Sequence, residues 1–77
     1  MAIRSRQSFA KLFGKRVREI RESRKISLKH FEALENSFSR NALSDIETGK
    51  KVPNLYTVYR ISIVLKVPIE KLLNGLT

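Results

Sequence analysis

A chain of 77 residues, 42% of them hydrophobic, has room for one domain with a modest core. The absence of cysteine excludes disulfides and thiolate metal sites, and one histidine alone makes neither a metal site nor a catalytic triad. No apolar run reaches the roughly 18 residues of a membrane span, and residues 1–11 lack the apolar stretch of a signal peptide. We therefore expect a cytoplasmic protein with no cofactor, no metal and no membrane partner.

The formal net charge of +9 is concentrated near the N-terminus. Residues 1–25 carry nine basic side chains against Glu19 and Glu22, a net of +7, whereas residues 26–77 carry a net of +2. A basic segment on a small domain favours a polyanionic partner, nucleic acid before membrane. The alternative is a solvated helix face that only aids solubility.

Residues 1–7 are polar and without periodicity, so we predict a flexible basic N-terminal arm, followed by one domain over residues 8–77. Arg4 and Arg6 of this arm are candidates for contacts with phosphates or a minor groove. From Ser8, a good N-cap, helical spacing predicts a first helix over residues 9–24. Its apolar positions are Phe9, Leu12, Phe13, Val17 and Ile20.

Two short helices are predicted next. Ser27 and Ser39 are N-cap candidates for helices over residues 28–35 and 40–47, and Asn36-Ser37 between them has turn chemistry. The apolar positions expected to lock these two helices together are Phe31, Leu34, Phe38, Leu43 and Ile46.

The remaining chain predicts two more helices. Gly49 stands where a helix end needs a left-handed residue, and Val52-Pro53 cannot extend that helix. Asn54 then caps a fourth helix from Leu55 to about Lys66, and a last one runs over residues 68–73. The prediction is an all-α, compact five-helix bundle.

Two short helices joined by a tight turn inside such a bundle are the layout of a DNA-reading helix-turn-helix. Arginine and asparagine suit bidentate readout of guanine and adenine. Asp45 could accept from a cytosine amino group or pair with a neighbouring arginine. The predicted base-reading residues are Arg40, Asn41, Ser44 and Asp45.

Phosphate contacts are expected around the same helices. Lys50 and Lys51 follow Gly49, where two cations and the free amides of a loop would suit an anion. The predicted phosphate contacts are Ser27, Lys29, Ser39, Thr48, Lys50 and Lys51. His30 is predicted to be a surface residue of the second helix.

Four segments of the chain carry recognisable motifs: GKRVREIR at 14–21, Ile26-Ser27, LSDIETGK at 43–50 followed by Pro53, and LKVPIEKLL at 65–73. Through these motifs the stretch from residue 13 to residue 73 resembles the phage-repressor and Cro-like (XRE-type) helix-turn-helix domains. The resemblance implies the lambda-repressor-like fold and a structural salt bridge between Arg21 and Glu47.

Three features depart from the family's usual pattern. Leu28 stands where the family usually has a glutamine that contacts phosphate and braces the recognition helix. Asn36-Ser37 replaces the usual glycine that closes the second helix, and the interval from Ile26 to Ile46 is one residue longer than the common pattern. These departures concern base-contact assignments rather than the fold.

The fourth helix carries two apolar stripes, and a domain this small seldom hides both. The stripe expected to face the core is Leu55, Val58, Ile61, Ser62 and Leu65. The other stripe, with one residue near the C-terminus, is predicted to form a homodimer interface of Tyr56, Tyr59, Ile63, Val67 and Leu76. The alternative is a single broad core face.

These features predict a transcriptional regulator that binds a palindromic operator on double-stranded DNA as a homodimer, with no small-molecule effector. A phage-type repressor, a restriction–modification controller, an antitoxin and a mobile-element regulator all remain open. The alternative class is a basic RNA-binding or ribosome-associated protein, although aromatic platforms and RNA-module motifs are missing. An enzyme is not expected, because no nucleophile–base pair, metal cluster or phosphate loop is present in the sequence.

Overall fold

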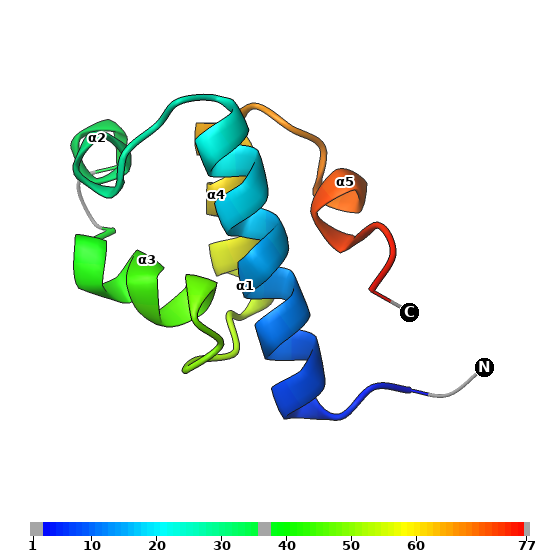
Figure 1. Ribbon diagram of the computed structural model, residues 1–77. Coiled ribbons are helices and arrows are strands. Elements are labelled where there is room, and N and C mark those ends of the chain that lie inside the picture. The colour runs from blue at the N-terminus through cyan, green and yellow to red at the C-terminus, as the bar shows by residue number, and fades with distance from the viewer. Residues whose placement is uncertain (1–2, 36–37, 77) are drawn as a thin grey trace.

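A computed structural model describes residues 3–35 and 38–76, so the predicted turn at Asn36-Ser37 lies outside the described residues. All regular structure within those ranges is helical, which confirms the all-α prediction. The elements, shown in Figure 1, are α1 (Arg6–Ser23), α2 (Leu28–Leu34), α3 (Arg40–Glu47), α4 (Leu55–Leu65) and α5 (Ile69–Leu73). None of the described helices is long and apolar enough to cross a membrane.

Side-chain N-caps begin four of these helices. The side chains of Ser5, Ser27, Ser39 and Asn54 each accept a hydrogen bond from the backbone N–H three residues later. This satisfies one of the N–H groups that a helix start leaves without an intrahelical acceptor. The predicted cap at Ser8 is wrong, because the N–H of Ser8 itself donates to Ser5 at 3.1 Å.

Helix α1 therefore takes up Arg6 and Gln7, which were predicted to belong to the arm. The guanidinium of Arg4 also has a fixed partner, since its Nε donates to the carbonyl oxygen of Leu76 at 2.6 Å. Figure 1 shows residues 3–5, which precede α1, on the side of α5 and away from α3. Arg4 would have to leave this bond to reach a DNA groove.

The core lies where α1 packs against α3, α4 and α5, and α2 joins it through its contact with α3. Phe31 of α2 and Phe38 of the connection between α2 and α3 meet edge to face, with ring centroids 5.5 Å apart. Leu34 was expected to join them but is 54% exposed, so this prediction is wrong. The buried apolar residues are Ala10, Phe13, Val17, Ile20, Phe31, Phe38, Leu43, Ile46, Val58, Ile61, Leu65, Val67, Leu72 and Leu76.

The predicted division of α4 into two stripes needs correction at three positions. Leu55, assigned to the core, is 77% exposed, whereas Val67 and Leu76, assigned to the interface, are each only 7% exposed. The cause at Val67 is the end of α4, because Lys66 is left-handed with φ of 57°. The chain turns back there, the N–H of Val67 donates to the carbonyl of Ser62, and the side chain enters the core.

Candidate nucleic-acid interface

Helix α3 buries one face and exposes the other. Leu43 and Ile46 are buried in the core, as predicted from their spacing. Arg40 and Asn41 are exposed in the first turn of α3, and Ser44 lies one turn further along. In Figure 1, α3 lies on one side of α1 and α5 lies on the other, so this outer face is not covered by α5.

The C-terminal end of α3 is packed against α1 at backbone distance. A Cβ atom added to Gly14 would lie 2.1 Å from the carbonyl oxygen of Ile46 and 2.7 Å from that of Glu47. Only glycine permits so close an approach of one helix backbone to another. Gly14 therefore determines how near the end of α3 comes to the middle of α1.

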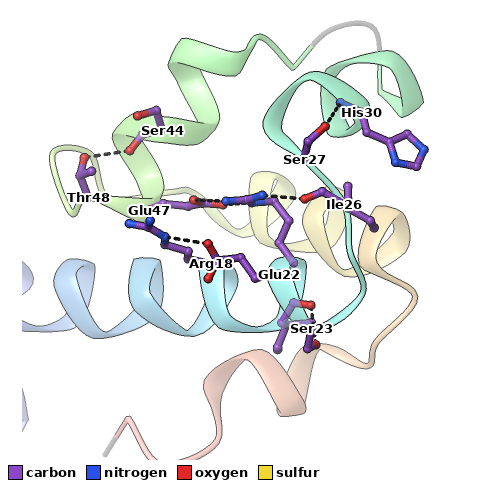
Figure 2. Close-up of polar contacts among 11 residues, drawn as sticks. Arg18, Glu22, Ser23, Ile26, Ser27, His30, Ser44, Glu47 and Thr48 are labelled. Atoms are coloured by element: carbon purple, nitrogen blue, oxygen red, sulfur yellow. Dashed lines mark hydrogen bonds and ion pairs between the residues drawn. The ribbon is translucent and has the colours of Figure 1, made fainter.

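The same end of α3 is held by a buried ion pair. The guanidinium of Arg21 donates from Nε to Oε2 of Glu47 at 2.6 Å and from Nη2 to Oε1 at 3.1 Å. Its Nη1 also donates to the carbonyl of Ile26 at 2.6 Å, and Figure 2 shows Glu47 and Ile26 at the two ends of this network. The side chains of Arg21 and Glu47 are each more than nine-tenths buried. The pair joins α1, the turn before α2 and the end of α3.

The hydrogen bond from Arg21 to Glu47 raises the pKa of the guanidinium, against the lowering effect of burial. A raised pKa means that the charged form is favoured in the folded state. Arg21 is therefore charged throughout the pH range in which proteins are ordinarily studied.

Two of the predicted base-reading residues have acidic or basic partners. The Nε of Arg40 lies 3.4 Å from Oε1 of Glu32, a residue of α2 that the sequence did not single out. Oδ2 of Asp45 lies 3.8 Å from Nζ of Lys51, so the ion-pair partner of Asp45 is a lysine rather than an arginine. Both pairs lie on or beside the exposed face of α3.

Three of the predicted phosphate contacts are hydroxyl groups, and they differ in the hydrogen bonds that they already make. The hydroxyls of Ser27 and Ser39 accept hydrogen bonds as caps, so their O–H groups remain able to donate to an anion. The hydroxyl of Thr48 instead donates to the carbonyl of Ser44 at 2.8 Å, as Figure 2 shows. Thr48 would have to give up that bond before donating to a phosphate.

The basic residues predicted to contact phosphate are all exposed: Lys29 on α2, and Lys50 and Lys51 after α3. Gly49 between Thr48 and Lys50 is left-handed, with φ of 78°, as its position predicted. The amides of Lys50 and Lys51 were expected to be free for an anion, and this is wrong. Both donate to the carbonyl oxygen of Asp45, at 2.8 and 3.3 Å. Only the side chains are left for phosphate.

The connection between α2 and α3 is longer than usual. Helix α2 ends at Leu34 and α3 begins at Arg40, so the connection spans residues 35–39. A turn of about three to four residues is typical of helix-turn-helix units. The extra length expected from the sequence therefore lies in this connection, where the N–H of Phe38 donates to the carbonyl of Glu35 at 3.0 Å.

Comparison with known proteins agrees with this architecture. A family model described as a helix-turn-helix domain matches residues 14–76. The chain belongs to the helix-turn-helix family. The resemblance to XRE-type domains inferred from the sequence is thereby confirmed.

The helix-turn-helix domain has a relative in Bacillus subtilis (strain 168), the uncharacterized HTH-type transcriptional regulator RghRB. The two sequences are 37% identical over 62 residues, which cover 79% of this chain and 44% of the relative. The chain thus spans less than half the length of that regulator. No solved structure matches this chain.

Proposed function

We propose that this helix-turn-helix domain binds double-stranded DNA sequence-specifically, as a homodimeric transcriptional regulator on a palindromic operator. The observation that carries the proposal is the exposed face of α3, which presents Arg40 and Asn41 while Leu43 and Ile46 anchor the opposite face. Arginine pairs with O6 and N7 of guanine, and asparagine with N6 and N7 of adenine, in the major groove. Membership of the helix-turn-helix family and the name of the Bacillus relative support this function.

The charge of the molecule supports a nucleic-acid partner. The net charge is +9, and Lys29, Lys50 and Lys51 are exposed on the elements that flank or follow α3. Lysines on both sides of a reading helix can contact the phosphates of the two strands that border a groove. Asp45 is compatible with such a surface because Lys51 lies beside its carboxylate.

Homodimerisation is proposed because α4 keeps an exposed apolar stripe after Val67 and Leu76 have been assigned to the core. Tyr56, Tyr59 and Ile63 are all about half or more exposed, and the two tyrosine rings stack with centroids 6.2 Å apart. A single helix-turn-helix contacts too few base pairs to select one site among about 10⁶ or more competitors. Two domains about one DNA turn apart, roughly 34 Å, would match an inverted repeat.

The DNA proposal is tested by in-vitro selection of bound duplexes from a random pool, followed by sequencing. We expect an inverted repeat with half-sites about one helical turn apart. Arg40→Ala or Asn41→Ala should weaken binding to the selected duplex by about 1–3 kcal/mol and change binding to random DNA little. Lys71→Ala, at an exposed residue of α5, is the control for removal of one positive charge. Recovery of no common sequence, or tighter binding to single-stranded RNA, would contradict the proposal.

The dimer is tested by sedimentation of the parent protein and of Ile63→Asp. We expect a dimer for the parent and a folded monomer with weak operator binding for the variant, because an isologous contact would bring the two introduced carboxylates together. Ile3→Asp makes the same substitution at an exposed isoleucine outside the helices and should leave the dimer intact. A parent protein that is monomeric at high micromolar concentration would contradict dimerisation through α4.

A further inference from the structure

Glu32 of α2 contacts both the backbone and the side chain of Arg40. Its Oε2 accepts a hydrogen bond from the N–H of Arg40 at 3.0 Å, and its Oε1 lies 3.4 Å from the Nε of Arg40. The two residues belong to different helices, so one carboxylate holds the beginning of α3 against α2. The side chain of Glu32 is 38% exposed and that of Arg40 is 57% exposed, so the Arg40 guanidinium is accessible from solvent.

The contact with Glu32 occupies only one part of the Arg40 guanidinium. Arginine presents five N–H donors in a planar fork, and a carboxylate at Nε leaves the two terminal amino groups as a second pair of donors. That second pair can still make a bidentate contact with O6 and N7 of guanine. A guanidinium anchored at Nε also has fewer orientations to lose when it binds a base edge.

The charge of Glu32 acts on non-specific binding as well. Binding to random DNA depends on neutralising phosphates, and a carboxylate beside Arg40 both repels phosphate and competes with it for the guanidinium. Binding to the preferred site gains the base contact of a correctly oriented Arg40, which offsets part of this repulsion. Glu32 should therefore lower the affinity for random DNA more than the affinity for the operator.

We infer that Glu32 is a positioning residue that sets the DNA specificity of this domain through Arg40. The inference rests on the proposed function, because it assigns a role within the same DNA-reading face. A role in capping α3 alone is distinguishable, since Ser39 already accepts from the N–H of Ala42 at 3.1 Å. Glutamine at position 32 would keep an acceptor for the N–H of Arg40 while removing the charge that holds its guanidinium.

The experiment measures the affinity of the full chain for the selected duplex and for a scrambled duplex of equal length, at several salt concentrations. Parent protein, Glu32→Gln, Arg40→Ala and the double variant are compared at a temperature where circular dichroism shows all four folded. Glu70→Gln is the matched control, because it makes the same change of charge at an exposed residue of α5, across α1 from α3.

We expect Glu32→Gln to lower the ratio of specific to non-specific affinity by about fivefold or more, the lower end of what one bidentate base contact contributes. Its affinity for the scrambled duplex should rise relative to the parent, and its loss of ratio should vanish in the Arg40→Ala background. Glu70→Gln should leave the ratio unchanged.

Two results would overturn the role of Glu32. One is a ratio for Glu32→Gln equal to that of the control, and the other is an equal loss of ratio with and without Arg40. If the parent protein still prefers the selected duplex, either result contradicts only the role of Glu32 and not the proposed DNA function. A parent protein with no preferred duplex would overturn the proposed function and this inference together.

Discussion

Replacing Gly14 with alanine should destabilise this domain, although the same change in most helices has the opposite effect. At an exposed position inside a helix, alanine is more favourable than glycine by about 1 kcal/mol. Gly14 lies inside α1 and is buried, and the new methyl group would lie 2.1 Å from the carbonyl oxygen of Ile46. Ordinary van der Waals contact begins near 3.4 Å, so the helices would have to separate by more than about 1 Å.

The magnitude follows from what such a separation disturbs. Overpacking a well-packed site costs about 1–3 kcal/mol even when the neighbours are side chains that can move. Here the neighbours are backbone carbonyls of Ile46 and Glu47, and moving them also displaces the Glu47 carboxylate from Arg21. We expect a net loss of at least about 2 kcal/mol, from a total of about 4–12 kcal/mol for a domain of this length.

Urea unfolding followed by circular dichroism gives the free energy of unfolding for the parent and for Gly14→Ala. Gln7→Ala, on the exposed surface of the same helix, is the control and should stay within about 0.5 kcal/mol of the parent. A Gly14→Ala variant as stable as the parent, or more stable, would show that α1 and α3 do not approach so closely in solution.

Glu47→Gln should cost about 3–5 kcal/mol of unfolding free energy, because it leaves the buried guanidinium of Arg21 without its carboxylate. A loss below about 1 kcal/mol in urea unfolding would contradict the burial of this pair. Val67→Asp should unfold the domain whereas Ile63→Asp should not, which far-ultraviolet circular dichroism would test. Arg4→Ala should lower the unfolding midpoint slightly, because it removes one hydrogen bond worth about 0.5–1.5 kcal/mol. An unchanged midpoint would indicate that Arg4 belongs to a flexible arm, as the sequence predicted.

The helix order and most helix starts were predictable because the physics involved is local. Ser27, Ser39 and Asn54 act as caps through hydrogen bonds to residues three positions away, which a sequence shows directly. Gly49 was predictable for the same reason, since a left-handed residue after a helix favours glycine. Ser5 was missed because the apolar periodicity of α1 begins only at Phe9, and the first turn of the helix carries no apolar residue.

The burial of α4 and of the residues after it was less predictable, because it depends on where the helix ends. Continuing the helical spacing beyond Leu65 places Val67 on the stripe of Tyr59 and Ile63. The left-handed conformation of Lys66 breaks that continuation and turns Val67 inward. The prediction for Leu55 is wrong because of the other end of α4. This residue has core spacing but stands in the first turn, where it is 77% exposed.

The two ends of α3 also differ in how far the sequence revealed their partners. Arg21 and Glu47 lie in segments that resemble a known family, so the ion pair at the C-terminal end of α3 could be inferred from that resemblance. The backbone approach at Gly14 was not predicted. Glu32 lies outside those segments, and its contact with Arg40 crosses the lengthened connection of residues 35–39. No local rule of capping or spacing assigns a partner across such a connection.

An eight-residue helix such as α3 is too short to be stable alone in water, so its orientation must come from tertiary contacts. At its C-terminal end α1 supplies them, through the backbone approach at Gly14 and the ion pair of Arg21 with Glu47. At its N-terminal end α2 supplies them, through the carboxylate of Glu32. A short helix held at both ends by different elements cannot pivot about either one. It can therefore present Arg40 and Asn41 in a fixed direction, which readout of individual bases requires.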